Sequence, residues 1–342
     1  MNRADKAVLR LAVGLGLAVL VAYGLALTAP YVVCVMAVLV LCKPGPPIPL
    51  FKGAVIAAAI AALMAGGVLL VPVLEHYALA GVMLTGALLY AVFFSGARKA
   101  NPLATIVVMA LTLIPVVGVV EQALAFSVGV TLAAGICIGV LVSGASHALF
   151  PDEAAPAGTS AAGATASLES ASWTALRATL VVLPVFVLAL TNPSFYLAAI
   201  MKTAALSQQA GSTSARSAGR ELVGSTLMGA WMAALVWFGL SLRPNLWMLM
   251  LWMMTAALWT GARLFGVKAT SLPPSFWSNA LVTMLILLGP AIEDSATGKD
   301  VLSASAIRVA LFVAVALYAW ATVWALEHWR ASRSSSLFFK RG

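Results

Sequence analysis

Apolar residues in this sequence form long runs that are separated by short polar stretches. A helix rises about 1.5 Å per residue, so about 20 apolar residues are needed to cross about 30 Å of bilayer hydrocarbon. The pattern predicts an all-α polytopic membrane protein with about twelve transmembrane helices. The predicted spans are about 9–27, 30–42, 53–73, 78–96, 103–120, 123–149, 175–191, 193–206, 221–241, 245–262, 276–292 and 302–326.

Two of these runs are too short to cross a bilayer comfortably. The run 30–42 leads into a proline-rich stretch from Lys43, and the run 193–206 leads into Ser207-Gln208-Gln209-Ala210-Gly211-Ser212-Thr213. Each gives only about 20 Å of helix. Unwound backbone at membrane depth is tolerated only where it lines a cavity, and paired short spans mark transporter sites. We therefore expect both helices to break at these points, beside a cavity.

Residues 151–172 are rich in Ala, Gly, Ser and Thr, which predicts a flexible linker between two halves. We divide the chain into a first six-helix repeat (1–150), this linker, a second six-helix repeat (173–330) and a basic cytoplasmic tail (331–342). Six spans return the chain to the side on which it started. The halves are therefore expected to be parallel repeats.

Matching features in the same order in both halves support an internal duplication. Pro30 and Pro193 begin the two short spans. Later in each half, Val107-Val108-Met109 corresponds to Val282-Thr283-Met284, and a proline follows at the same spacing.

The composition excludes an ordinary soluble protein, because 62% of residues are hydrophobic, only 9% are charged and the mean hydropathy is +1.02. Basic residues concentrate in alternate connections, which predicts both termini on the cytoplasmic side of a bacterial inner membrane. The net charge of +9 is spread along the chain, so we expect no nucleic-acid partner. The sequence has no P-loop, HExxH or metal-ligand cysteine spacing, and we expect neither enzyme activity nor a cofactor or metal.

Lys202 lies inside the second short span, where an ionisable side chain is costly and usually functional. The alternative is that Lys202 snorkels to the cytoplasmic interface. The polar stretch that follows leads into the next helix, and free amides at a helix N-terminus together with arginines would suit a carboxylate. An ordinary polar loop is the alternative there. The candidate substrate-binding residues are Lys202, Gln208, Gly211, Ser212, Thr213, Arg216, Arg220, Ser225 and Thr226.

Three acidic residues near the opposite face are candidates for proton coupling. Glu121 follows one span of the first half, and Glu293 and Asp294 end the matching span of the second half. Carboxylates at matching helix ends could relay protons, or they could be solvated loop acids.

All ten tryptophans lie in the second half. Trp247, Trp252, Trp259 and Trp277 occur among several methionines, which suggests an adaptable surface for flat ligands. Packing against lipid at the membrane interface is the alternative.

The motif Arg220-x3-Gly224-Ser225-Thr226-x2-Gly229, which follows Gly211-Ser212-Thr213 and Arg216, resembles the motif region of the fusaric acid resistance and aromatic acid exporter superfamily. The resemblance implies an inner-membrane efflux transporter for aromatic or related organic acids. It also implies coupling to the proton gradient and a periplasmic membrane-fusion protein as partner. In the first half Lys52 keeps the charge, but the rest of the motif is alanine-rich. We therefore expect the second half to hold the site.

Two other functions are compatible with these features. One is a passive organic-anion channel, because plant malate channels look distantly similar to this superfamily. The other is a membrane scaffold that assembles a periplasmic partner without transport. In each case we expect a homodimer in the lipid bilayer, and for the exporter a small organic anion as substrate.

Overall fold

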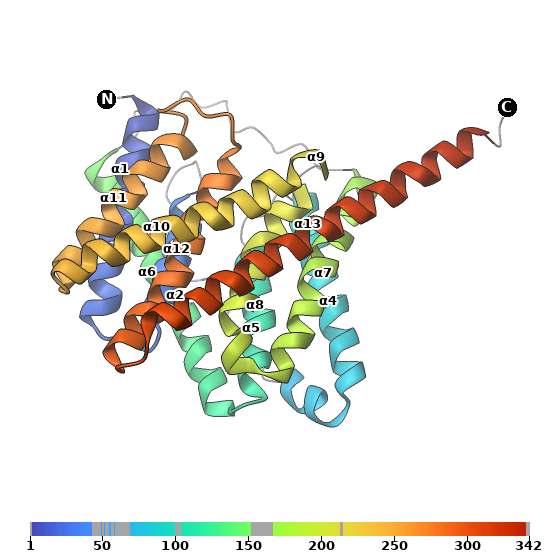
Figure 1. Cartoon of the computed structure of the whole chain (residues 1–342), viewed down its shortest axis with the longest axis horizontal. Helices are drawn as coiled ribbons and strands as arrows, with labels where there is room; N and C mark the ends of the chain where they lie inside the picture. Colours follow the sequence, from blue (N-terminus) through green and yellow to red (C-terminus); the bar gives the residue numbers. More distant parts are fainter. Residues whose placement is uncertain are drawn as a thin grey trace.

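The computed structural model describes residues 2–42, 69–99, 104–151, 167–212 and 215–339, together with positions 49, 51, 55 and 58. Every regular element with defined bounds in these ranges is a helix, and one of them, η1, is a π-helix (Figure 1). The helices are α1 (Arg3–Gly24), α2 (Pro30–Leu41), α4 (Ala78–Lys99), α5 (Ala104–Gly118), α6 (Gln122–Leu149), α7 (Leu168–Thr191), α8 (Pro193–Ser212), α9 (Ala215–Ala218), η1 (Gly219–Val223), α10 (Gly224–Leu242), α11 (Leu246–Leu264), α12 (Pro274–Ala296) and α13 (Val301–Phe339).

Among the described residues, seven helices are long and apolar enough to cross a membrane, and three shorter apolar helices accompany them. This indicates a multi-pass membrane protein, as the apolar pattern predicts. The predicted span 53–73 lies largely outside the described residues, although residues 69–76 are helical. Each of the other predicted spans falls on a described helix.

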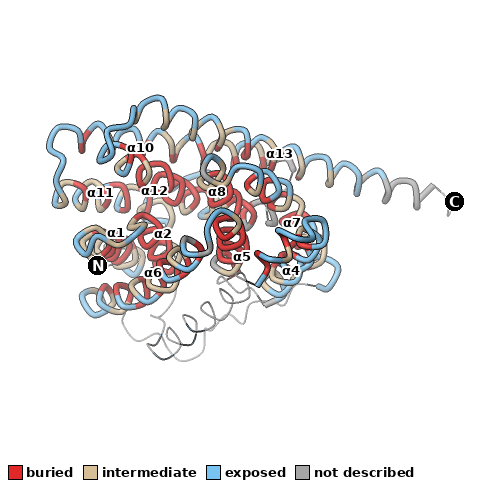
Figure 2. The backbone as a smooth tube through the Cα atoms, turned by 90° about the horizontal axis from the view of Figure 1, so that it is seen from below, coloured by how far each residue is buried: buried red, intermediate tan, exposed pale blue. Residues whose placement is uncertain are grey.

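The helix α2 is short, as predicted, and lies in the interior of the bundle. Figure 2 shows buried residues concentrated on α2, α5, α8 and α12. α2 packs against α1, α6 and α12. Its contact with α6 uses Gly135 and Gly139, because a Cβ at either position would lie within 3.2 Å of an α2 backbone carbon, at Val33 and Ala37 respectively. Such small residues at four-residue spacing let two membrane helices approach closely. The stretch after α2, from Lys43 to Ile48, lies outside the described residues.

The expected break after the second short span is wrong, because α8 continues through Gly211 and ends at Ser212. Two effects favour the helix over the break. The Ser207 hydroxyl donates to the Ala204 carbonyl at 2.7 Å, so it is satisfied within the helix. Glutamine and alanine are also good helix formers. The polar residues from Ser207 to Ser212 therefore form the C-terminal end of α8.

Two helices extend into the segments predicted as a linker and a tail. α7 begins at Leu168, where the Ser167 side chain accepts a hydrogen bond from the Ser170 backbone N–H and caps the helix. Residues 152–166 lie outside the described part. α13 runs on to Phe339, so much of the predicted tail, 331–342, belongs to a helix about 58 Å long. Figure 1 shows its C-terminal end projecting away from the other helices.

Replacing Gly139 with leucine should separate α2 from α6, whereas the same change at Gly144 should be tolerated. A Cβ at Gly144 meets nothing within 4 Å, although it lies on the same helix. Overpacking a helix contact costs about 1–3 kcal/mol or more, so we expect Gly139→Leu to lower the thermal unfolding midpoint in detergent by about 5 °C or more. Gly144→Leu is the matched control. Equal midpoints for the two variants would contradict this packing.

Candidate functional site

Lys202 is fully buried in the middle of α8, so its side chain does not reach the membrane surface. Its Nζ donates to the Thr283 Oγ1 at 2.5 Å and to the Asn279 Oδ1 at 3.4 Å, and both acceptors lie on α12. Lys202 forms no ion pair with any described residue. The Lys202 Nζ is thus held by neutral partners within the described part of the chain. Such a group is costly unless a counter-charge reaches it.

Asn279 connects Lys202 to a third helix. While its Oδ1 accepts from Lys202, its Nδ2 donates to the Ser225 Oγ on α10 at 2.6 Å. The close approach of α10 and α12 depends on Gly229, because a Cβ there would lie 2.6 Å from the Ala280 carbonyl oxygen. Lys202, Asn279, Thr283 and Ser225 form one buried cluster, which we call the Lys202 cluster.

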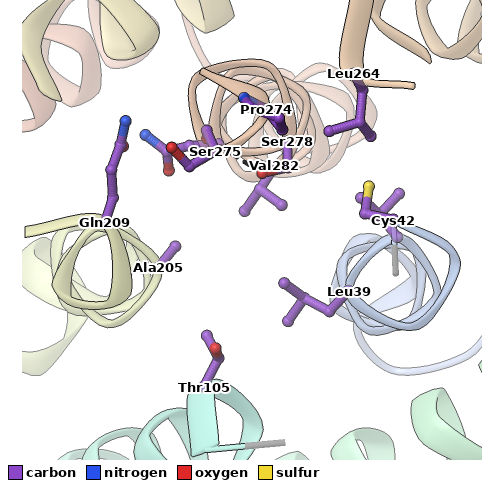
Figure 3. A pocket seen from close by; sticks show the side chains of 12 residues that line it. Leu39, Cys42, Thr105, Ala205, Gln209, Leu264, Pro274, Ser275, Ser278 and Val282 are labelled. Atoms are coloured by element: carbon purple, nitrogen blue, oxygen red, sulfur yellow. Dashed lines mark hydrogen bonds between the residues drawn. The ribbon is translucent and has the colours of Figure 1, made fainter. Parts of the chain in front are cut away.

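A cavity of about 270 Å³, which Figure 3 shows from close by, adjoins this cluster. Asn279 lines the cavity and also belongs to the cluster. It is lined by residues of α2, α5, α8, α11 and α12, with the Gln209 side chain on the α8 side. The full lining comprises Val38, Leu39, Cys42, Thr105, Ala205, Gln209, Leu264, Pro274, Ser275, Ser278, Asn279 and Val282. The cavity therefore has amide and hydroxyl groups on one part of its wall and apolar groups on the rest.

The motif around Arg220 begins in the π-helical segment η1. Arg220 itself is exposed, whereas the neighbouring Glu221 is buried and its carbonyl oxygen accepts from the Gln209 Nε2 at 3.4 Å. Single π turns within α-helices occur frequently at functional sites. Here the π turn contacts the cavity-lining Gln209 and leads into α10, which carries Ser225 of the Lys202 cluster.

The other predicted binding residues are placed as follows. Ser225 is buried within the Lys202 cluster, and the buried Thr226 donates to the Leu222 carbonyl of its own helix at 2.8 Å. Gly211 and Ser212 form the end of α8, so the predicted turn does not begin there. Thr213 lies outside the described residues, and so do the side chains of Gln208 and Arg216.

The three candidate proton-coupling residues do not lie together in one cluster. Glu121 is the exposed residue that precedes α6. Glu293 is exposed near the end of α12, and Asp294 beside it is buried and pairs with Arg308 of α13 at 2.6 Å. Thr283 precedes Asp294 by eleven positions, or about 16 Å along α12. No three His, Cys, Asp or Glu side chains in the described ranges could together hold a metal ion.

Sequence reasoning missed the residues that hold Lys202. Asn279 and Thr283 come from a helix 77 and 81 positions further along the chain. One signal was present in the sequence: Asn279 is a lone amide within the apolar run 276–292. An amide in a transmembrane run needs a partner inside the protein, which could have pointed to Lys202.

Replacing Lys202 with methionine should leave the protein as stable as before or make it more stable. Methionine keeps much of the side-chain length and removes a buried charge that has only neutral partners. Asn279→Leu should instead lower the free energy of unfolding by about 1–3 kcal/mol, because Lys202 loses an acceptor. Unfolding in mixed detergent micelles, followed by circular dichroism, measures both variants.

The double variant Lys202→Met/Asn279→Leu provides the control for this prediction. If the Asn279 penalty arises from the buried ammonium, the double variant should recover most of the stability that Asn279→Leu loses. Additive effects of the two changes would show that the two side chains act independently.

The comparisons with known proteins reach only the first part of the chain. A family described as "Protein of unknown function (DUF2955)" matches residues 7–145. That stretch runs from α1 into α6 and contains no residue of the Lys202 cluster. No curated protein and no solved structure matches the chain. The chain is thus similar, over residues 7–145, to a family whose function is not described.

Proposed function

We propose that this protein is an inner-membrane efflux transporter for aromatic or related organic acids. The observation that carries the proposal is Lys202, a fully buried lysine beside a cavity, whose partners among the described residues are neutral. An organic anion that enters the cavity would bring the missing counter-charge. The resemblance of the Arg220 motif to the aromatic acid exporters supports the same substrate class.

The lining of the cavity supports a ligand with a polar head and an apolar body. Asn279, Gln209 and Ser278 offer hydrogen-bonding groups, whereas Leu39 and Val282 offer apolar contact. Ligand sites commonly measure about 300–1,000 Å³, so a cavity of about 270 Å³ suits a small acid of about one ring.

The proposal includes two parallel six-helix repeats, for which the helix contacts provide support. The first helix of each half packs against the fourth helix of the other half, as α1 does with α11 and α7 with α4. The second helix of each half packs against the fifth of the other, as α2 does with α12 and α8 with α5. A duplicated chain with a two-fold axis would produce these reciprocal pairs.

The cavity would then lie between equivalent helices, with Lys202 in contact with one of its lining residues, Asn279. Lys202 and Leu39 occupy the same position after Pro193 and Pro30, the prolines that begin α8 and α2. Leu39 lines the cavity, and Lys202 lies behind Asn279. The first half therefore contributes a mostly apolar wall, and the second half contributes the lysine. We propose one anion site, alternately exposed to either side of the membrane.

Coupling, orientation and partners complete the proposal. Export would be driven by protons, with Glu121, Glu293 and Asp294 as coupling candidates, and both termini would be cytoplasmic. A periplasmic membrane-fusion protein would receive the substrate, and the transporter would work as a homodimer. The motif resemblance and the alternation of basic connections support these points.

Export of radiolabelled aromatic acids from cells tests the function directly. We expect cells that contain the protein to retain less of at least one acid in a broad panel. Lys202→Met should reduce that export about tenfold or more, because the anion loses its counter-charge. Lys299→Met removes an exposed lysine before α13 and should leave export unchanged. Equal retention of every acid with and without the protein would refute the proposal.

Purified protein separates the exporter from the alternatives. In proteoliposomes we expect acid flux that depends on a pH gradient. Unitary currents in a planar bilayer would indicate a passive channel instead. A Lys202→Met variant that still assembles with its periplasmic partner but no longer exports would exclude a pure scaffold.

A further inference from the structure

A second, smaller hollow lies on the membrane-facing side of α10 and α11. It has a volume of about 170 Å³ and is almost entirely apolar. Its lining comprises Trp231, Met232, Leu235, Val236, Trp252, Thr255, Ala256 and Trp259. Trp231 and Leu235 are 54% and 45% exposed, so this groove opens toward the bilayer. The Thr255 hydroxyl donates to the Leu251 carbonyl at 2.8 Å, so it is satisfied within its own helix.

Arg263 lies at one end of this groove and stacks on one of its walls. Its Cζ is 3.9 Å from the centre of the Trp259 ring, and its Nη1 donates to the Trp259 carbonyl at 2.8 Å. Trp231 also lines the groove, and its ring centre is 6.2 Å from that of Trp259. Arg263 forms no ion pair with any residue in the described ranges. The Arg263 guanidinium thus contacts the wall of an apolar groove, and only one of its nitrogens donates to the Trp259 carbonyl.

A buried hydrogen-bond donor next to Arg263 also lacks an acceptor. Trp277 is 4% exposed, and its Nε1 has no hydrogen-bond partner in the described structure. Its ring contacts Trp259 edge-on at 5.5 Å, and its centre is 5.0 Å from the Arg263 Cζ. Because buried N–H groups in native proteins are nearly always paired, an acceptor is missing at this point. An anionic oxygen would serve both donors.

This end of α11 lies at the level of the membrane surface that is rich in basic residues. Gly261 packs against Val8 and Leu11, so Arg263 is level with the first turns of α1, where Arg3 and Lys6 are found. Anionic lipid headgroups accumulate beside such basic segments. The position therefore suits a headgroup at Arg263 and a hydrocarbon chain that extends along the groove toward the bilayer centre.

We propose that Arg263 and the Trp231–Trp259 groove form a binding site for an anionic phospholipid. The phosphodiester accepts hydrogen bonds from the Arg263 guanidinium and from the Trp277 indole N–H, and an acyl chain packs along the groove. This site does not depend on what the Lys202 cavity carries. A failure of the transport proposal would leave it intact.

Native mass spectrometry of the purified full-length protein with added dioleoyl phosphatidylglycerol tests this site. We expect one tightly bound lipid, and binding that is about five- to tenfold weaker in Arg263→Gln. Arg243→Gln is the matched control. Arg243 is an exposed arginine directly after the C-terminal end of α10, and its loss changes the net charge equally. Size-exclusion chromatography establishes that each variant is folded. Equal affinity of Arg263→Gln and the wild type, or equal binding of phosphatidylcholine, would overturn the proposal.

Trp231→Leu tests the acyl part of the site at an exposed position where the fold is not at risk. We expect about threefold weaker binding of the dioleoyl lipid and unchanged binding of dihexanoyl phosphatidylglycerol, whose chains are too short to fill the groove. An equal loss for both lipids would overturn the assignment of the groove to an acyl chain. Displacement of the bound lipid by benzoate would also overturn it, by assigning the groove to a small acid.

Discussion

The bilayer interior supplies no water to pair with polar groups, and this constraint determines where the chemistry of this protein can lie. Many hydroxyl groups in the spans donate to a carbonyl one turn earlier in the chain, as Thr203 does to Ala199 and Thr226 to Leu222. Lys202 cannot be satisfied in this way, because its ammonium carries three donors at the end of a long side chain. It reaches α12, and Asn279 extends the contact to Ser225 of α10. The Lys202 cluster thus joins three helices through polar groups that one helix does not satisfy by itself.

The sequence predicted the helices and the position of Lys202 inside a span, because both follow from local composition. It failed at the end of α8, where polar residues were interpreted as a break although Ser207 and Gln209 find hydrogen-bond partners in the folded chain. It also missed Asn279, since nothing within one apolar run indicates which distant helix will lie beside it. The π turn η1 was equally unpredictable, because its residues are compatible with an ordinary helix.

The spacing of the Arg220 motif explains why its members do not share one surface. Successive residues of an α-helix are about 100° apart, so positions separated by five residues point about 140° apart. The π turn alters this angle locally, yet Arg220 remains exposed while Ser225 is buried. Arg220 does not line the cavity, and the proposed site does not require it to contact a ligand there. In the transport proposal, Arg220 would act at the membrane surface, and Ser225 would act through Asn279.

The two halves of the chain contribute different properties to the cavity. Residues 7–145, where the chain is similar to a family of undescribed function, supply Val38 and Leu39 of α2 and Thr105 of α5. Lys202, Asn279 and Ser225 all lie beyond that stretch. A protein that resembles only the first half could therefore share this cavity wall without sharing its cation. For the anion hypothesis, the informative comparison is consequently whether a related protein keeps a lysine on α8 together with an amide on α12.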